Sequence, residues 1–460
     1  MQDILQTFRD YYRTPAVRNR ILEFLGGATP AEATCEFITA DGIGQPVRAP
    51  RSPGELFDRL DEGLDICRSL WDRESLIAHL DIEYVNFDFA AEAYLDPPRT
   101  FLMQEPTARA ILRVLNYHGI EPLHVLSGRG HHFAWQIERT STAFKTLADM
   151  GRKAYVGDPR SLSLRDNNDY AMLAHAFAGL GLVMEFLGRV VIELARSETE
   201  IPIELTAVEV GPSERGREMV SIDLSEYGDP LHTRSIRVPF SAYLKPWQQL
   251  YAVGSNNISK IGPIIFVPVD GLDIRQAMVV MRDPGLAAKF AERVSTRIPE
   301  QTFGTASLIR QYRGSGLRRY HEFFYSSMHD APESWPRTYD RAPLADLPHE
   351  AKNALMFPND LLLKPTGIRK VTECLMERGW HPRHIAGLIR SKFERDYDWG
   401  GQWIDYSPAM RADFYVRIFS SAKTSVAQEA ARIQGREVVL ESHAAHREYR
   451  PVTQQLELRL

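Results

Sequence analysis

Cysteine is scarce in this chain of 460 residues, which contains only Cys35, Cys67 and Cys374. Three scattered cysteines cannot build a disulfide framework, and they do not form the paired spacing of a structural zinc motif. Small secreted folds that depend on disulfides are therefore excluded. The low cysteine content predicts a protein of the reducing cytoplasm.

Export and membrane signals are also lacking. The N-terminal residues mix acidic, basic and aromatic side chains, whereas a signal peptide begins with basic residues and continues with an apolar core. The most hydrophobic region is 171–195, but Glu185, Arg189 and Glu193 interrupt it. This pattern predicts a buried helix and no membrane span.

A phosphate-binding P-loop is absent, because no glycine in the chain is followed directly by lysine. Any helicase that works with this protein must therefore be another protein. The net charge of −5 excludes a uniformly basic coat, so a nucleic-acid site would have to be a local patch. Apolar residues at 44% and charged residues at 25% are typical of a globular protein, and the length allows two or more domains.

A glycine-rich turn at 127–130 interrupts two apolar runs within residues 124–137, HVLSGRGHHFAWQI. The pattern predicts two strands joined by a tight turn. Strand alternation places His132 on a small polar face and His131 on the opposite, apolar face. The turn could offer backbone N–H groups to an anion, with Ser127 and Arg129 as further donors. A surface hairpin with incidental histidines is the alternative.

Carboxylates stand on two other predicted strands, LDIEYVNFD at 80–88 and VSIDL at 220–224. Asp81 and Glu83 project from one face of the first strand, and Asp223 leaves the second strand between two apolar residues. Burying three carboxylates together is costly unless positive charge lies among them. Oxygen-only ligation suits Mg²⁺ or Mn²⁺, and two such ions can serve phosphoryl chemistry.

Taken together, these motifs resemble those of the archaeo-eukaryotic primase superfamily. Its members carry a DxD or DxE strand, an SGxxGxH-like hairpin and a strand with a lone aspartate, in that order. A further R-x-P-x-S-x-H-x-K run often follows, and residues 237–245, RVPFSAYLK, match it except at Tyr243, where histidine is common. The resemblance covers residues 75–246.

The resemblance implies a template-dependent nucleotidyltransferase, a DNA primase or polymerase that adds nucleotides to a 3′-hydroxyl and releases pyrophosphate. Asp81, Glu83 and Asp223 would hold two Mg²⁺ or Mn²⁺ ions. The implied partners are a single-stranded DNA template and nucleoside triphosphates. The implied triphosphate cradle is Ser127, Arg129, His132, Arg237, Ser241 and Lys245, with His132 also counted as catalytic.

Three other functions remain open. The carboxylates could serve a metal-dependent nuclease, although hydrolysis has no use for a long triphosphate cradle. The chain could be a degenerate primase relative that binds nucleic acid without chemistry, although idle buried acids would cost stability. It could also be an end-joining polymerase rather than an initiator of synthesis.

The expected fold class is α+β, with a primase-type catalytic core whose mixed sheet resembles an RNA-recognition motif and is backed by helices. We expect helices at 99–119 and 170–197 in this core. A helical C-terminal domain should follow, in which 368–378 and 382–393 flank a turn at 379–381. The expected units are a catalytic domain (1–250), an intermediate or linker region (251–350), a helical domain (351–425) and a charged tail (426–460).

A second candidate site for nucleic acid lies within residues 310–320, RQYRGSGLRRY. Arginines that alternate with tyrosines and glycines could bind a phosphate backbone and stack on bases. A flexible solvated linker is the alternative. The arginines concerned are Arg310, Arg313, Arg318 and Arg319.

Overall fold

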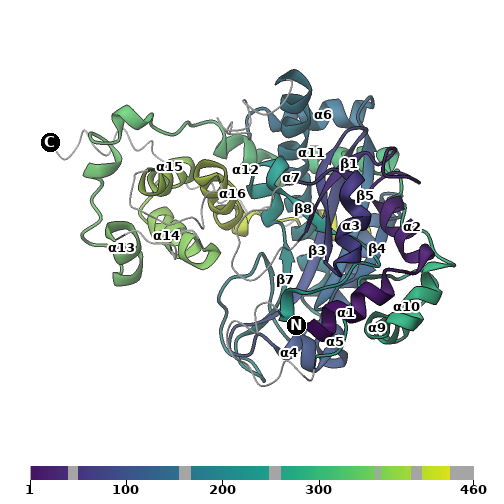
Figure 1. The fold of residues 1–460 in the computed structure, drawn as a ribbon. Coiled ribbons are helices and arrows are strands. Elements are labelled where there is room, and N and C mark those ends of the chain that lie inside the picture. Colours follow the sequence, from purple (N-terminus) through teal and green to yellow (C-terminus); the bar gives the residue numbers. More distant parts are fainter. Residues whose placement is uncertain are drawn as a thin grey trace.

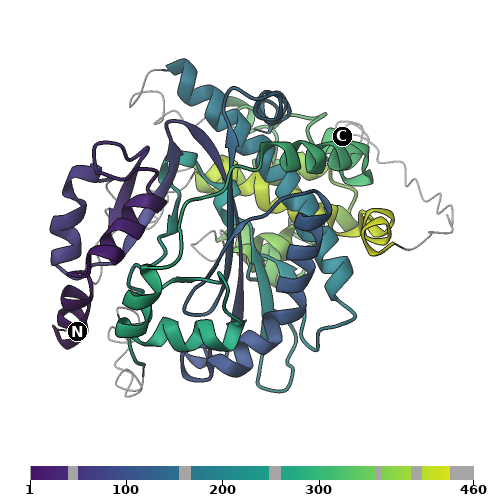
Figure 2. The ribbon, with the colours of Figure 1, turned by 90° about the vertical axis from the view of Figure 1, so that its right-hand side faces the viewer.

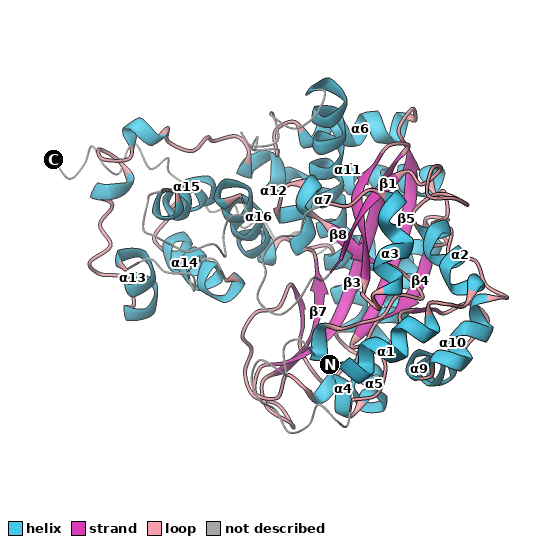
Figure 3. Ribbon diagram, viewed as in Figure 1, coloured by secondary structure: helices cyan, strands magenta, loops and turns pink. Residues whose placement is uncertain are grey.

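A computed structural model gives the fold of this chain (Figure 1). It describes residues 2–39, 50–154, 167–247, 261–357, 362, 364–394 and 407–435. Helices and strands are both present in it, as Figure 3 shows by colour. The expected α+β class with a helical C-terminal region is confirmed.

The larger sheet has six strands in the order β6-β7-β3-β5-β4-β9. All neighbouring pairs are antiparallel except β6 and β7, which are parallel, so the sheet is mixed as expected. The strand-turn-strand prediction is confirmed, because β4 and β5 pair across the glycine turn. The strands are β6 Ile203–Leu205, β7 Glu218–Asp223, β3 Ser75–Asn86, β5 Gly130–Glu138, β4 Leu123–Leu126 and β9 Val267–Pro268.

One face of this sheet is covered by two long helices, α5 (Pro97–Tyr117) and α7 (Asn167–Ala195). The apolar even-numbered residues of β3, such as Leu80 and Ile82, are fully buried. Both expected helices are therefore confirmed. The short helices α4 (Glu92–Leu95) and α6 (Thr142–Gly151) pack beside α5 and α7 respectively.

A second sheet of three antiparallel strands, in the order β1-β2-β8, lies next to β3. Its strands are β1 Cys35–Thr39, β2 Ile66–Asp72 and β8 Ser235–Arg237. The N-terminal helices α1 (Gln2–Tyr11), α2 (Pro15–Phe24) and α3 (Leu56–Asp61) lie along this edge of the molecule (Figure 2). The three-stranded sheet was not predicted from the sequence.

The region after residue 260 is packed into the same core. Strand β9 pairs with β4, and the Trp135 Nε1 of β5 donates to the Thr305 hydroxyl of α11 at 2.9 Å. The interpretation of 310–320 as a flexible linker is wrong, because these residues form α11 and α12 around a buried Tyr312. The helices here are α9 Ile274–Arg282, α10 Pro284–Ala291, α11 Thr302–Gly314 and α12 Gly316–Phe324.

Helices α13 to α16 gather at one side of the core (Figure 1), whereas α17 packs against α7 and α5. The expected helical pair is confirmed as α14 and α15, which flank Gly379. Residues 436–460 of the predicted charged tail lie outside the described residues. The helices are α13 His349–Met356, α14 Pro365–Glu377, α15 Pro382–Phe393, α16 Pro408–Ser420 and α17 Ala427–Gln434.

Helix α7, which contains the most hydrophobic stretch, is a core helix as predicted. Its Glu185 is fully buried, and the carboxylate accepts from Arg417 of α16 at 2.9 Å. The same carboxylate meets His321 of α12 at 3.2 Å. In the part of the chain that the structure describes, no helix has the length and apolar character needed to cross a lipid bilayer.

Candidate functional site

Asp81 lies at the centre of the site, in the middle of the six-stranded sheet. In the register of the sheet it stands directly opposite His132 of β5 and Asp223 of β7. Side chains in such cross-strand pairs lie on the same face, with Cβ atoms about 4.5–5.5 Å apart. The prediction that these side chains share one face of the sheet is thus confirmed for all three strands. Glu83, two residues after Asp81 on β3, lies on the same face.

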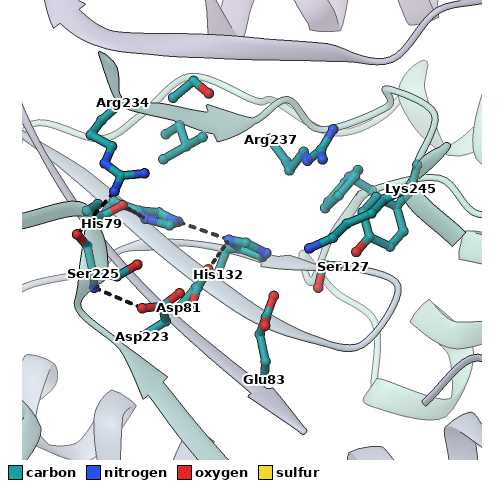
Figure 4. A pocket seen from close by; sticks show the side chains of 15 residues that line it. His79, Asp81, Glu83, Ser127, His132, Asp223, Ser225, Arg234, Arg237 and Lys245 are labelled. Atoms are coloured by element: carbon teal, nitrogen blue, oxygen red, sulfur yellow. Dashed lines mark hydrogen bonds and ion pairs between the residues drawn. The ribbon is translucent and has the colours of Figure 1, made fainter. Parts of the chain in front are cut away.

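The face that carries Asp81 lines a pocket of about 160 Å³ between the two sheets. Acidic side chains and histidines of the larger sheet form its floor, and basic side chains near β8 and after it face them (Figure 4). The pocket therefore places positive charge beside the buried carboxylates. Its lining includes His79, Asp81, Glu83, Ser127, His132, Asp223, Ser225, Glu226, Arg234, Arg237, Tyr243 and Lys245.

The surroundings of Asp81 disfavour the charged form of its carboxyl group. Burial raises its pKa well above the usual value, and the neighbouring carboxylates of Asp223 and Glu83 raise it further. Its Oδ1 is buried and has no hydrogen-bond partner among the described residues. A buried acceptor without a partner is costly, so this atom is suited to binding a cation or a donor from a ligand.

Glu83 is paired with a predicted phosphate-binding residue. Its Oε2 forms an ion pair with the Arg129 guanidinium from the glycine turn. Burial acts to raise the pKa of Glu83, but Arg129 and Lys245 outweigh it, so the pKa is lowered. Glu83 is therefore ionised, and Arg129, a predicted phosphate-binding residue, is bonded to it and is not among the residues that line the pocket.

The basic wall comes from residues 237–245, where the chain turns sharply. Phe240 has a φ of 64°, a left-handed conformation that is uncommon for residues other than glycine. Its ring is fully buried, which holds the turn in place. The turn lets Arg237 and Lys245 line the same pocket. Arg129 and burial lower the pKa of Lys245 to about 8.

His132 belongs to a hydrogen-bonded series of three side chains. The other two members, His79 and Glu226, were not predicted as site residues from the sequence. Its Nδ1 lies 3.0 Å from the Nε2 of His79, and the Nδ1 of His79 lies 2.9 Å from Glu226 Oε2. Burial and the nearby His79 hold the pKa of His132 well below its usual value, so the ring is neutral at pH 7. Strand alternation could have identified His79, because it lies two residues before Asp81 and its side chain must therefore point to the same face of β3.

His131 lies on the opposite face of β5, as predicted. It is almost fully buried, and its Nδ1 lies 2.9 Å from His124 Nε2. Its ring meets the edge of the Phe101 ring of α5, with centroids 5.3 Å apart. This histidine therefore belongs to the core between sheet and helix.

The two predicted serines stabilise turns. The Ser127 hydroxyl accepts from the backbone N–H of Gly130 at 3.0 Å, and it also donates to the Gly130 carbonyl at 3.2 Å. Ser127 does line the pocket. Ser241 does not, because its buried hydroxyl accepts from the backbone N–H of Ile66 at 2.7 Å. Both hydroxyls are already engaged, so neither is a ready phosphate donor.

Arg234 is another cation of the pocket that the sequence motifs did not reveal. It forms an ion pair with the fully buried Asp229, which also pairs with Arg411 of α16 at 3.1 Å. The 3-10 helix η3 (Ser225–Gly228), which carries Glu226, packs against α16 as well. The helical C-terminal region therefore contacts the elements that line the pocket.

The other predicted nucleic-acid residues lie apart from the pocket, on α11 and α12. Arg310, Arg313 and Arg319 are exposed, and Arg318 pairs with Glu322 one helical turn away. Tyr312 is buried and cannot stack on a base. The arginines stay a prediction as a phosphate-binding patch.

Comparison with known protein families, with curated proteins and with solved structures finds no match to this chain. The donor atoms of the pocket therefore carry the functional argument. Asp81, Glu83 and Asp223 present oxygen ligands of the kind that Mg²⁺ and Mn²⁺ prefer. The orphaned Asp81 Oδ1 suits a cation, and the binding of two Mg²⁺ or Mn²⁺ ions by these three carboxylates stays a prediction.

Proposed function

We propose that the pocket is the active site of a template-dependent nucleotidyltransferase of the primase-polymerase type. One observation carries the proposal: Asp81 stands between Asp223 and His132 on one floor, and Arg237 and Lys245 lie across the pocket from it. Carboxylates facing cations suit a reaction between a metal-bound hydroxyl and a polyphosphate.

The size of the pocket supports binding of the polyphosphate rather than of a whole nucleotide. About 160 Å³ is less than the roughly 300–1,000 Å³ of pockets that enclose an entire ligand. The triphosphate would enter, while the sugar, the base and the template would lie at the mouth. This arrangement suits an enzyme that reads the base through pairing with a template.

In this proposal Asp81, Glu83 and Asp223 would hold two divalent ions, and these ions would supply activation of the attacking 3′-hydroxyl and neutralisation of charge on the triphosphate. Lys245 and Arg237 bind phosphate oxygens of the incoming nucleotide. Arg129, bonded to Glu83 and close enough to Lys245 to lower its pKa, adds positive charge near the triphosphate. Positioning and fixed charge then favour in-line attack and departure of pyrophosphate.

His132 contributes a hydrogen bond from the floor. Its Nδ1 is directed to His79, so its other ring nitrogen, Nε2, lies on the side towards Lys245 (Figure 4). A donor at that position would bind a phosphate oxygen and bind it more strongly as charge develops.

The test is nucleotide incorporation by the full-length protein on single-stranded DNA of defined sequence. Each reaction contains Mn²⁺ or Mg²⁺ and either ribo- or deoxynucleotides, with and without an annealed primer. Extension that follows the template supports the proposal, and products without a primer identify an initiator. Shortening of the DNA with no incorporation would identify a nuclease instead and overturn it.

A further inference from the structure

Two histidines and one carboxylate meet on the floor of the pocket. One ligand atom from each of His79, Asp81 and His132 lies within 4.8 Å of the other two. His79 is almost fully buried, and the side chains of His132 and Asp81 are only 13% and 16% exposed. This set differs from the carboxylate set of the proposed function, because two of its three donors are nitrogens.

The ring of His79 is oriented for metal binding by a second carboxylate. Its Nδ1 donates to Glu226 Oε2 at 2.9 Å, so Nε2 carries the lone pair and faces His132. A carboxylate that holds the far side of a histidine ring is the usual support of a metal ligand, since it fixes the tautomer and raises the basicity. Without an ion, Nε2 of His79 accepts from Nδ1 of His132.

The spacing of these atoms also fits one ion. The two ring nitrogens are 3.0 Å apart. A metal–nitrogen distance of about 2.1 Å places two ligands at right angles about 3.0 Å from each other. Asp81 Oδ2 lies 3.7 Å from His132 Nδ1, and its partner oxygen Oδ1 is buried without a hydrogen bond among the residues described.

We propose that His79, Asp81 and His132 form a mixed nitrogen–oxygen site for one divalent transition-metal ion, with Glu226 orienting His79. Imidazole ligands favour first-row transition ions, whereas Mg²⁺ prefers a shell of oxygens alone. The site therefore selects Mn²⁺ or a later transition ion over Mg²⁺. A role for this ion in catalysis rests on the proposed function. Binding of the ion can be measured whether or not the protein synthesises DNA.

Such an ion explains how His132 can donate to a triphosphate. When the ion occupies Nδ1, the proton of the neutral ring is placed on Nε2, the nitrogen that faces Lys245. His132 then binds the metal through one nitrogen and the phosphate through the other. Without the ion, Nδ1 carries the proton and Nε2 can only accept.

The site can be tested by adding Mn²⁺ to metal-free full-length protein and recording pulsed electron paramagnetic resonance. The expected spectrum contains couplings to ¹⁴N of histidine. His79→Ala and His132→Ala should each weaken Mn²⁺ binding at least about tenfold, and Glu226→Ala should weaken it about 10- to 100-fold. The matched control is His131→Gln, the adjacent residue on the opposite face, which should leave Mn²⁺ affinity unchanged. A large excess of Mg²⁺ should displace the ion poorly.

The wild-type spectrum decides the question even where a variant does not fold. Bound Mn²⁺ without nitrogen couplings, or no binding at all, overturns the site. If the ion has oxygen ligands alone and DNA is synthesised, the proposed function stands and this site falls. If nitrogen couplings are present but no nucleotide is incorporated under any condition, the site stands and the proposed function falls.

Discussion

Asp229, beside the pocket, and Arg411, on the C-terminal helix α16, form a buried ion pair in which Oδ2 and Nη2 are 3.1 Å apart. The same carboxylate holds Arg234, which lines the pocket. Asp229 thus links helix α16 to the pocket, because it pairs with Arg411 on one side and with Arg234 on the other.

We expect Arg411→Ala to impair both stability and nucleotide use. Removing one charged partner of a buried carboxylate costs about 1.5–3 kcal/mol, and Asp229 keeps its bond to Arg234. The KM for nucleotide should rise because Asp229, which holds Arg234 at the pocket, loses one of its two cationic partners. Thermal melts and steady-state kinetics measure the two effects.

The control for this variant is Arg196→Ala, which removes an ion pair with Glu193 at the exposed end of α7. A surface pair of this kind contributes about 0–1 kcal/mol. Equal behaviour of the two variants would show that α16 does not support the pocket.

The two adjacent histidines of β5 should have separate roles. His132→Ala removes one hydrogen bond to charged phosphate, worth roughly 1.5–3 kcal/mol, or about 10- to 150-fold in kcat/KM for nucleotide. His131→Ala leaves His124 and Phe101 around a cavity, and it should mainly lower the melting temperature. Kinetics and melts of both variants test this pair. A catalytic defect confined to His131→Ala contradicts the assignment.

Lys245 should give nucleotide use a pH dependence. Its pKa is about 8, lowered by Arg129 and burial, so the side chain is charged below this pH and neutral above it. The kcat/KM for nucleotide should therefore fall as pH rises through about 8, since this parameter reports the free enzyme.

The matched variant is Lys245→Arg, because a guanidinium stays protonated over this range. In this variant the decline should move to higher pH or disappear. An identical alkaline decline in both proteins would exclude Lys245 as its source.

Alternation along the strands was sufficient to predict three residues of the pocket floor, although His79 on the same face of β3 was missed. Asp81, Asp223 and His132 were assigned to one face because side chains on a strand alternate, and the register places them in one row. The same rule placed His131 on the core side. Sequence could predict these positions because each lies within a strand whose other face is apolar.

The rest of the site depends on contacts between distant segments. Arg234 and Glu226 come from the short 3-10 turns and connections after β7, which are too short for a repeating pattern to fix the direction of a side chain. The serines matched the motif, but their hydroxyls bond to backbone N–H groups, that of Gly130 in the same turn for Ser127 and that of the distant Ile66 for Ser241. The small sheet was missed because it joins strands from segments far apart in the chain, at residues 35–39, 66–72 and 235–237.

Asp81→Asn should abolish synthesis without unfolding the protein. The fold raises the pKa of Asp81, so this carboxyl group lowers the free energy of unfolding of the metal-free protein as pH rises above the ordinary carboxyl pKa. Replacing it with a neutral amide relieves repulsion from Asp223 and Glu83. The free energy of unfolding should stay the same or rise, and the gain should be larger at neutral pH than at pH 4.

The most direct measurement of the central claim is template-directed incorporation by wild-type protein, Asp81→Asn and Asp223→Asn, each checked by thermal melts. Asp88→Asn is the control, because that carboxylate lies just beyond the same strand in an exposed pair with Arg217. The account predicts incorporation by the wild type and Asp88→Asn and none by the two pocket variants. Full incorporation by a folded Asp81→Asn or Asp223→Asn protein would contradict it.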